Sequence, residues 1–476
     1  MQKTLLFYDL ETTGLDKSYD QVQQFAAIRT DLDLNELERH EIFVKINPDI
    51  IPSPEALLVH RVSISQCNEI GLNEYEAMQK IHALLNTPNT ISIGYNTLGF
   101  DDEFLRFSFH RNLLTPYTHQ FANGCGRADL YPMAAMLRWQ EADCISWPKI
   151  DGKPTLKLEH ISATNQLAQG QAHNALVDVE ATIALSKRFQ SSESSWQYLL
   201  GYFDKHQESK RFTKLEKFSP APSFQLAIML DGQFGSQRLY QCPVLGLGAH
   251  KHYRNQTLWL KCDQEDLIEL NEKNLDTLPW IIRKKSGESP FFLPNKPRFM
   301  NRLSKTQSET LARNLNFLSE RPALLKKIQA YHSEWQYPEL PELPAQAGLY
   351  QSDFLSATDL RQCAAFHEAK PSQKAVIADK FRRPNLKNLA DNILAKHYPE
   401  IASDEQNQNL QNQISKYMQN EPMLNHQGKP RRTLSDLQEA LIECQAKDLD
   451  ASQCSLLEEL NTTITETIAS KPTHLA

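Results

Sequence analysis

Long apolar runs are missing from this sequence of 476 residues. A membrane-spanning helix needs about 20 consecutive apolar residues, and no stretch approaches that length. The first residues also lack the charged and apolar regions of a secretion signal. The eight cysteines are scattered and include no C-x-x-C pair, which argues against a disulfide framework and a cysteine zinc site. We therefore expect a cytoplasmic protein with reduced thiols.

An excess of positive charge is missing as well. The chain has 51 Lys and Arg against 58 Asp and Glu, a formal net charge of −7. It is therefore no polycation, and any binding of nucleic acid would need a local basic track within an acidic chain. Repeats and long low-complexity runs are also absent, and the length suits two or three domains that each bury a core.

The pattern of apolar residues changes twice along the chain. The first part begins with strand-like stretches and continues with helical ones, which predicts a mixed sheet with helices packed on it. The predicted strands are 5–11, 24–34 and 40–48, and the predicted helices are 73–86, 101–114 and 174–190.

A polar stretch at 190–196 is interpreted as a linker, and the Pro-rich stretch 338–348 marks a second boundary. Short β-like runs dominate the part between them, and helical patterns dominate the part that follows. We predict an α/β domain over 1–196, a small β-rich domain over 197–346 and an all-helical domain over 347–476.

Two carboxylates interrupt the end of the first predicted strand. Asp9 and Glu11 lie in the sequence LLFYDLETTGL, and side chains two residues apart on a strand point to the same face. Like charges on one face of a buried strand are costly unless a cation lies between them. Taken alone, such a pair is more often a solvated strand end than a site.

Three more residues make a functional site the better interpretation. Asp101 opens a predicted helix after an apolar strand-like run, while Asp102 and Glu103 could fill the usual role of acidic residues at a helix start. Asp178 lies near the start of the helix that Asn174 would cap, and His173 precedes that cap.

Each of these residues has an ordinary structural explanation, since an Asp in a first turn usually serves the helix dipole. Four carboxylates and one His together favour a functional site, because their positions at strand ends and helix starts can bring them to one edge of the sheet. Clustered carboxylates without cations would take up protons. Oxygen-rich clusters suit Mg²⁺ or Mn²⁺, so the sequence predicts a pair of divalent metal ions.

Three motifs carry a resemblance to a known family. They are DLETTGL, the N-x3-F-D pattern in NTLGFDDEFL and the H-x4-D pattern in HNALVD. Together they resemble the DEDD 3′→5′ exonucleases of the histidine subclass, which have a ribonuclease-H-like fold. Over nearly its whole length the chain looks like the bacterial exodeoxyribonuclease I family, whose layout is an exonuclease domain, an SH3-like β domain and a helical C-terminal domain.

The resemblance implies a mechanism and a substrate. Single-stranded DNA would be degraded from its 3′ end to 5′-mononucleotides, in DNA repair and recombination. Two Mg²⁺ ions, for which Mn²⁺ could substitute, would bracket the scissile phosphate. Asp9, Glu11 and Asp178 match the direct ligands, Asp101 matches a ligand or a holder of metal-bound water, and His173 matches the general base.

The resemblance also implies DNA contacts and a partner. Single-strand binding needs a basic track with aromatic platforms. Besides Glu11, the positions that match the family's substrate contacts are Arg106, Tyr117, Phe121, Lys157 and Asn255. At Lys157 the family usually has Arg, and Lys keeps the charge without the bidentate fork. The partner implied is the acidic C-terminal tail of single-stranded-DNA-binding protein, and we expect a monomer that has no membrane contact.

Two alternatives remain open from the sequence. One is an RNA-trimming or tRNA-trimming exonuclease with the same catalytic core, against which the long C-terminal two-thirds argues. The other is a nucleic-acid-binding or scaffold protein with a degenerate nuclease site, against which the five intact catalytic positions argue.

Overall fold

The computed structural model describes residues 2–169, 174–191, 193–276, 280–340 and 343–469. The chain divides into two compact units, which are described separately. The first contains 1–126, 169–180 and 339–476, and the second contains 127–168 and 181–338. The C-terminal helices thus share a unit with the N-terminal strands. The two boundaries between the three domains predicted from the sequence stay predictions.

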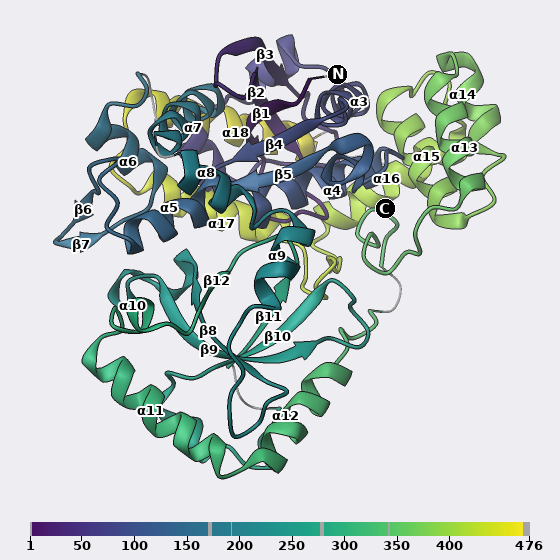
Figure 1. The fold of residues 1–476 in the computed structure, drawn as a ribbon. Coiled ribbons are helices and arrows are strands. Elements are labelled where there is room, and N and C mark those ends of the chain that lie inside the picture. The colour runs from purple at the N-terminus through teal and green to yellow at the C-terminus, as the bar shows by residue number, and fades with distance from the viewer. Residues whose placement is uncertain (1, 170–173, 192, 277–279, 341–342, 470–476) are drawn as a thin grey trace. The chain divides into compact units, whose positions relative to one another are not determined.

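The N-terminal sheet has five strands in the order β3-β2-β1-β4-β5 (Figure 1). Central β1 pairs antiparallel with β2 and parallel with β4, so the predicted mixed sheet with flanking helices is confirmed. The bounds are β1 (Thr4–Thr12), β2 (Val22–Thr30), β3 (Glu36–Phe43), β4 (Thr90–Gly94) and β5 (Gly126–Asp129).

The predicted second strand, 24–34, is too long at its C-terminal end. β2 ends at Thr30, because the Asp31 side chain forms a turn there. Asp31 Oδ1 accepts hydrogen bonds from the backbone N–H groups of Asp33 and Asn35, at 3.0 and 2.8 Å. Asp side chains favour turns of this kind over a continued strand.

Helices cover the sheet and supply its core. Apolar side chains of β1 and β2, among them Leu6 and Phe25, pack with Met78 and Ile81 of α3 and Phe104 of α4. The helices up to residue 200 are α1 (Pro54–His60), α2 (Ile64–Ile70), α3 (Glu74–Leu85), α4 (Asp101–Arg111), α5 (Leu130–Trp139), α6 (Leu158–Asn165), α7 (Ala175–Gln190) and α8 (Glu193–Leu200). The stretch 190–196, predicted to be a linker, therefore lies largely in helices, and Trp196 is buried.

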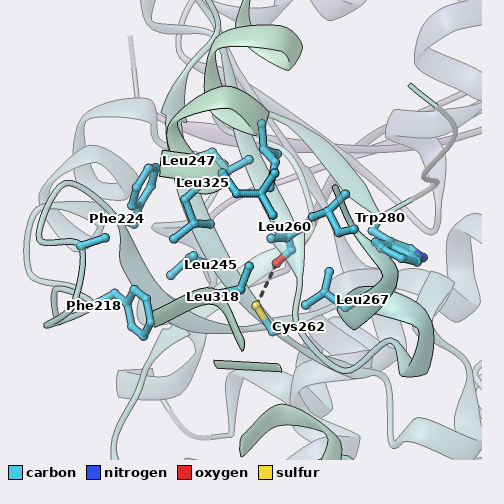
Figure 2. Packing of buried hydrophobic residues seen from close by; sticks show 14 of the residues in the cluster. Phe218, Phe224, Leu245, Leu247, Leu260, Cys262, Leu267, Trp280, Leu318 and Leu325 are labelled. Carbon is cyan, nitrogen blue, oxygen red and sulfur yellow. Dashed lines mark hydrogen bonds between the residues drawn. The ribbon is translucent and has the colours of Figure 1, made fainter. Parts of the chain in front are cut away.

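A five-stranded antiparallel sheet, in the order β11-β10-β9-β8-β12, forms the core of the second unit. Figure 2 shows Leu245, Leu247 and Leu260 of this sheet packed with Leu318 and Leu325 of α11 and α12. The predicted β-rich segment is thus confirmed, and its SH3-like class stays a prediction. The elements are the short β6 (Lys149–Ile150) and β7 (Lys153–Pro154), then α9 (Lys205–Phe212), β8 (Gln225–Leu230), β9 (Gln241–Ala249), β10 (Gln256–Lys261), β11 (Ile281–Lys285), β12 (Phe291–Pro294), α10 (Pro297–Met300), α11 (Lys305–Ser319) and α12 (Pro322–Glu334).

The C-terminal region is helical, as predicted, and it completes the core of the first unit. Leu57 of α1 packs with Leu437 of α17 and Leu457 of α18, and Tyr75 of α3 packs with Phe366. The helices are α13 (Ala357–Glu368), α14 (Pro371–Ala378), α15 (Pro384–His397), α16 (Asp404–Met418), α17 (Leu434–Gln445) and α18 (Ala451–Ala469). Within the described ranges no helix combines the length and apolarity that a bilayer crossing requires, and all eight cysteines are free thiols.

Candidate active site

Asp9 and Glu11 lie in the last part of β1, as the sequence predicted. In the antiparallel register Asp9 is opposite Ala26 and Glu11 is opposite Gln24 of β2. Their alternation along the strand places both side chains on one face. The pairing of β1 with β4 ends at Phe7, so both carboxylates lie on the part of β1 that only β2 pairs with, and both are half-buried.

Asp178 reaches the same place from α7. The cap predicted for this helix is confirmed, because Asn174 Oδ1 accepts hydrogen bonds from the N–H groups of Leu176 and Val177, at 3.1 and 3.3 Å. The cap fixes where the helix begins, and the Asp178 N–H bonds to the Asn174 carbonyl at 3.0 Å. The sequence from Asn174 onward thus sets the position of Asp178 in the first turn.

Three carboxylates meet at this point. Asp9, Glu11 and Asp178 each offer one ligand oxygen, and these oxygens all lie within 4.8 Å of one another. Two of the residues are separated from the third by more than 160 positions in the sequence, so only the folded sheet and helix bring them together. The cluster is half-buried.

Asp101 is the first residue of α4 and is 5% exposed. It is not one of the three clustered ligands, yet its charge raises the pKa of both Asp9 and Glu11. Asp102 and Glu103 could have capped this helix start, but the N-cap position is Phe100, which makes no side-chain capping bond. Asp102 and Glu103 both form ion pairs, with Arg106 and Lys17 respectively.

The electrostatics of the cluster call for a cation. Burial, together with the charges of Asp101, Glu11 and Asp178, raises the pKa of Asp9 well above its usual value. Burial and the charges of Asp178 and Asp101 raise the pKa of Glu11 to about 9. Carboxylates in this state bind protons unless a cation offsets their charge. An all-oxygen donor set of this kind fits Mg²⁺ or Mn²⁺.

The predicted DNA contacts of the first unit lie in α4 and in the segment after it. Arg106 is only 5% exposed, and its guanidinium donates to Asp102 at 2.6 Å and lies 5.7 Å from the ring centre of Tyr117. Phe121 is 68% exposed. A further aromatic ring, that of Phe354, is 85% exposed and lies 6.1 Å from Tyr117.

The other two predicted DNA contacts, Lys157 and Asn255, both belong to the second unit. Lys157 precedes α6, its side chain is 70% exposed, and its ammonium lies 3.3 Å from a Glu159 carboxylate oxygen. Asn255 lies exposed in the loop between β9 and β10. His173 lies outside the described residues.

Sequence reasoning did not single out Lys17, whose ammonium bonds to the chain on both sides of Asp101. It did not single out Phe354 either, whose ring lies beside that of Tyr117. The partners of Lys17 and Phe354 are far away in the sequence, so no local pattern could have marked either residue.

Comparison with known proteins agrees with this geometry. The family model described as Exonuclease matches residues 6–186, and the Exonuclease I C-terminal domain matches residues 345–466. Exodeoxyribonuclease I of Escherichia coli is 29% identical over 419 residues, which is 84% of this chain and 86% of that protein. Over most of its length the chain is therefore similar to exodeoxyribonuclease I.

Other similar proteins support this likeness. Exodeoxyribonuclease I of Haemophilus influenzae is 32% identical over 58% of this chain and 57% of its own length. A zinc-bound crystal structure of the E. coli enzyme with single-stranded DNA superposes with a TM-score of 0.85 at 25% identity, and covers 98% of this chain and 100% of that one. A complex of the E. coli enzyme with a dA16 oligonucleotide gives 0.84 at 26% identity, with the same coverage. On these likenesses the chain is a 3′→5′ exodeoxyribonuclease.

Proposed function

We propose that this enzyme hydrolyses single-stranded DNA from the 3′ end and releases 5′-mononucleotides, in DNA repair and recombination. The observation that carries the proposal is the convergence of Asp9, Glu11 and Asp178, with ligand oxygens within 4.8 Å of one another, in a chain similar to exodeoxyribonuclease I. Crystal structures of the E. coli relative contain single-stranded DNA.

Two Mg²⁺ ions are the proposed cofactors, and Mn²⁺ is the proposed substitute. Asp9, Glu11 and Asp178 would hold them, and Asp101 would serve as a fourth ligand or hold metal-bound water. When bound, such ions supply electrostatic stabilisation of the attacking and leaving oxygens. The protein contributes the rigid placement of four carboxylates, and the burial that raises the pKa of Asp9 strengthens their demand for a cation.

His173 is proposed as the general base that accepts the proton of the attacking water. An imidazole suits this step because its unperturbed pKa of about 6.5 lies near neutral pH. Its sequence position, directly before the Asn174 cap of the helix that carries Asp178, supports the assignment.

Substrate binding is proposed to combine stacking with charge. Phe121 and Tyr117 in the first unit, with Phe354 beside Tyr117, offer ring faces on which bases of a single strand can stack. Arg106 supports this surface through Tyr117. Lys157 and Asn255 are proposed to contact the strand from the second unit.

The proposed partner is single-stranded-DNA-binding protein, through its acidic C-terminal tail. A crystal structure of SSB and exonuclease I in complex with an inhibitor is similar to this chain at 24% identity. We further propose that the enzyme acts as a monomer in the cytoplasm.

The test is hydrolysis of a 5′-labelled single-stranded DNA with Mg²⁺ and with chelator, beside the same strand annealed to its complement and a matching RNA. The proposal predicts metal-dependent shortening from the 3′ end of the single DNA strand only. Shortening of RNA alone would favour the RNA-trimming alternative. No cleavage with any divalent metal would favour the binding-protein alternative.

A further inference from the structure

The loop that follows the metal-binding strand, residues 13–21, is ordered by its own side chains. Asp20 Oδ2 accepts a hydrogen bond from the Asp16 N–H at 2.8 Å, and the Asp20 N–H donates to the Asp16 carbonyl at 2.7 Å. A Cβ atom at Gly14 would lie 2.4 Å from Asp20 Oδ2, so this close turn requires glycine. The 13–21 loop is therefore a defined structure that begins two residues after Glu11.

One side chain of this loop reaches the start of α4. The Lys17 ammonium donates to the Gly99 carbonyl at 3.1 Å and to Glu103 Oε2 at 3.0 Å. Gly99 and Glu103 lie two residues before and two residues after Asp101. Lys17 thus joins the segment that carries Glu11 to both sides of the segment that carries Asp101, across more than 80 positions of sequence.

This ion pair is more sheltered than an ordinary surface pair. The side chains of Lys17 and Glu103 are each 17% exposed. Partial burial limits screening by salt and keeps the pair in one geometry. Because the Lys17 ammonium is bonded to both a carbonyl and a carboxylate, the positions open to the Lys17 backbone are also restricted.

The C-terminal region holds the 13–21 loop from another side. The Tyr19 hydroxyl donates to the Leu424 carbonyl at 2.6 Å, and Asn425 Nδ2 donates to Asp16 Oδ2 at 3.0 Å. The His426 N–H donates to Ser18 Oγ at 3.1 Å. These hydrogen bonds hold Ser18 and the backbone of its neighbour Lys17 in place beside α4.

We propose that Lys17 is a positioning residue for the metal site, which holds Asp101 at its working distance from Asp9 and Glu11. Metal ligands function only within narrow geometric limits, and Mg²⁺ is the most demanding of the common divalent ions. Outer groups that orient ligands commonly change metal affinity by about 10-fold to 100-fold. This inference rests on the proposed function, because it takes Asp101 as part of the metal site.

The first experiment compares Lys17→Met with the wild type in two readouts, Mn²⁺ affinity by calorimetry without DNA and steady-state hydrolysis of single-stranded DNA. We expect Mn²⁺ affinity to fall about 10-fold and kcat to fall with it, while KM for DNA stays unchanged. Lys17→Arg should recover most of the Mn²⁺ affinity, because a guanidinium can donate to both the Gly99 carbonyl and Glu103. Lys80→Met, an exposed lysine on α3 of the same unit, is the matched control and should match the wild type.

A double-mutant cycle separates positioning from general destabilisation. If Lys17 acts through Asp101, Lys17→Met should have no further effect on Mn²⁺ affinity in an Asp101→Asn background. A purely structural role would give additive losses and a lower unfolding temperature. Should Lys17→Met fail to fold, Glu103→Gln removes the charge of the pair from the other partner and should lower Mn²⁺ affinity in the same direction.

Wild-type Mn²⁺ affinity and kcat in Lys17→Met would overturn the inference. The failure of the proposed function would look different, since the wild type itself would then cleave no single-stranded DNA. The calorimetric comparison would remain decisive for Lys17 in that case, because it needs no turnover.

Discussion

Two sets of carboxylates in the first unit have opposite electrostatics. At the end of β1, the groups that surround Asp9 and Glu11 are other carboxylates, and together with burial they raise both pKa values. In the second set, Asp49 lies 2.7 Å from the Lys396 ammonium and Glu74 lies 2.7 Å from the Arg111 guanidinium. Burial by itself would raise the pKa of Asp49 and Glu74, but these cations bring both below their usual values.

The difference separates a site from a structural network. Burial does not explain the difference, because Asp49 and Glu74 are more deeply buried than the half-buried Asp9, Glu11 and Asp178, yet their pKa values are lowered. The sign of the neighbouring charge does distinguish them. Carboxylates paired with Lys or Arg side chains have their negative charge compensated within the protein. Carboxylates that surround one another keep an affinity for a cation from outside.

The largest expected effect comes from Asp9→Asn. The substitution keeps the shape of the side chain and removes one ligand charge, so activity on single-stranded DNA with Mg²⁺ should fall by roughly 1,000-fold or more, which is about 4 kcal/mol of transition-state stabilisation. Initial rates of 3′ shortening measure it. Asp33→Asn, in an exposed turn, is the control and should retain full activity.

Breaking the paired set should affect stability instead. Glu74→Ala leaves the Arg111 guanidinium buried without its carboxylate, and removal of one partner of a buried pair costs about 3 kcal/mol or more. Urea unfolding should therefore shift to lower concentrations, while kcat of the folded protein at low temperature stays near the wild-type value. Glu76→Ala, on the exposed face of the same helix, is the control. A loss of kcat without a loss of stability would contradict the distinction between the two sets.

The sequence predicted the acidic cluster better than the paired set. Asp9, Glu11, Asp101 and Asp178 occupy strand-end and helix-start positions with recognisable spacing, and so they could be found without a structure. The partners of Asp49 and Glu74 could not, since the contact of Asp49 with Lys396 spans 347 positions and depends on how the C-terminal helices pack. For the same reason, local patterns could not predict the core that the N-terminal strands share with the C-terminal helices. They could not predict the contacts of Lys17 either.

A third kind of buried charge gives a pH-dependent prediction. Lys374 is 3% exposed, its ammonium donates to the Tyr75 hydroxyl and the Phe366 carbonyl, and burial lowers its pKa to about 8. The unfolded chain keeps this proton up to about pH 10.5, so the cost of the buried charge is fully present below pH 8. It disappears as pH rises from about 8 to about 10.5.

Lys374→Met, which has no proton to lose, isolates this contribution. The stability of the wild type relative to Lys374→Met should therefore increase by about 2 kcal/mol between pH 7.5 and pH 10, measured by urea unfolding at each pH. Lys370→Met, an exposed lysine just before α14, should show no such trend. A constant difference across this range would mean that Lys374 keeps an ordinary pKa.

The smallest expected effect concerns the same Asp9→Asn protein without metal. Removing one of several repelling carboxylates should stabilise the metal-free protein at pH 8, by about 1 kcal/mol, even though the variant is inactive. Added Mg²⁺ should reverse the order, because binding to the folded state stabilises the wild type by about 3 kcal/mol at 100 times the dissociation constant and the variant by less. Thermal unfolding in EDTA and in Mg²⁺ measures both steps. If Asp9→Asn were less stable than the wild type in EDTA, Asp9 would have a structural partner like that of Glu74, and the contrast between the two sets would be lost.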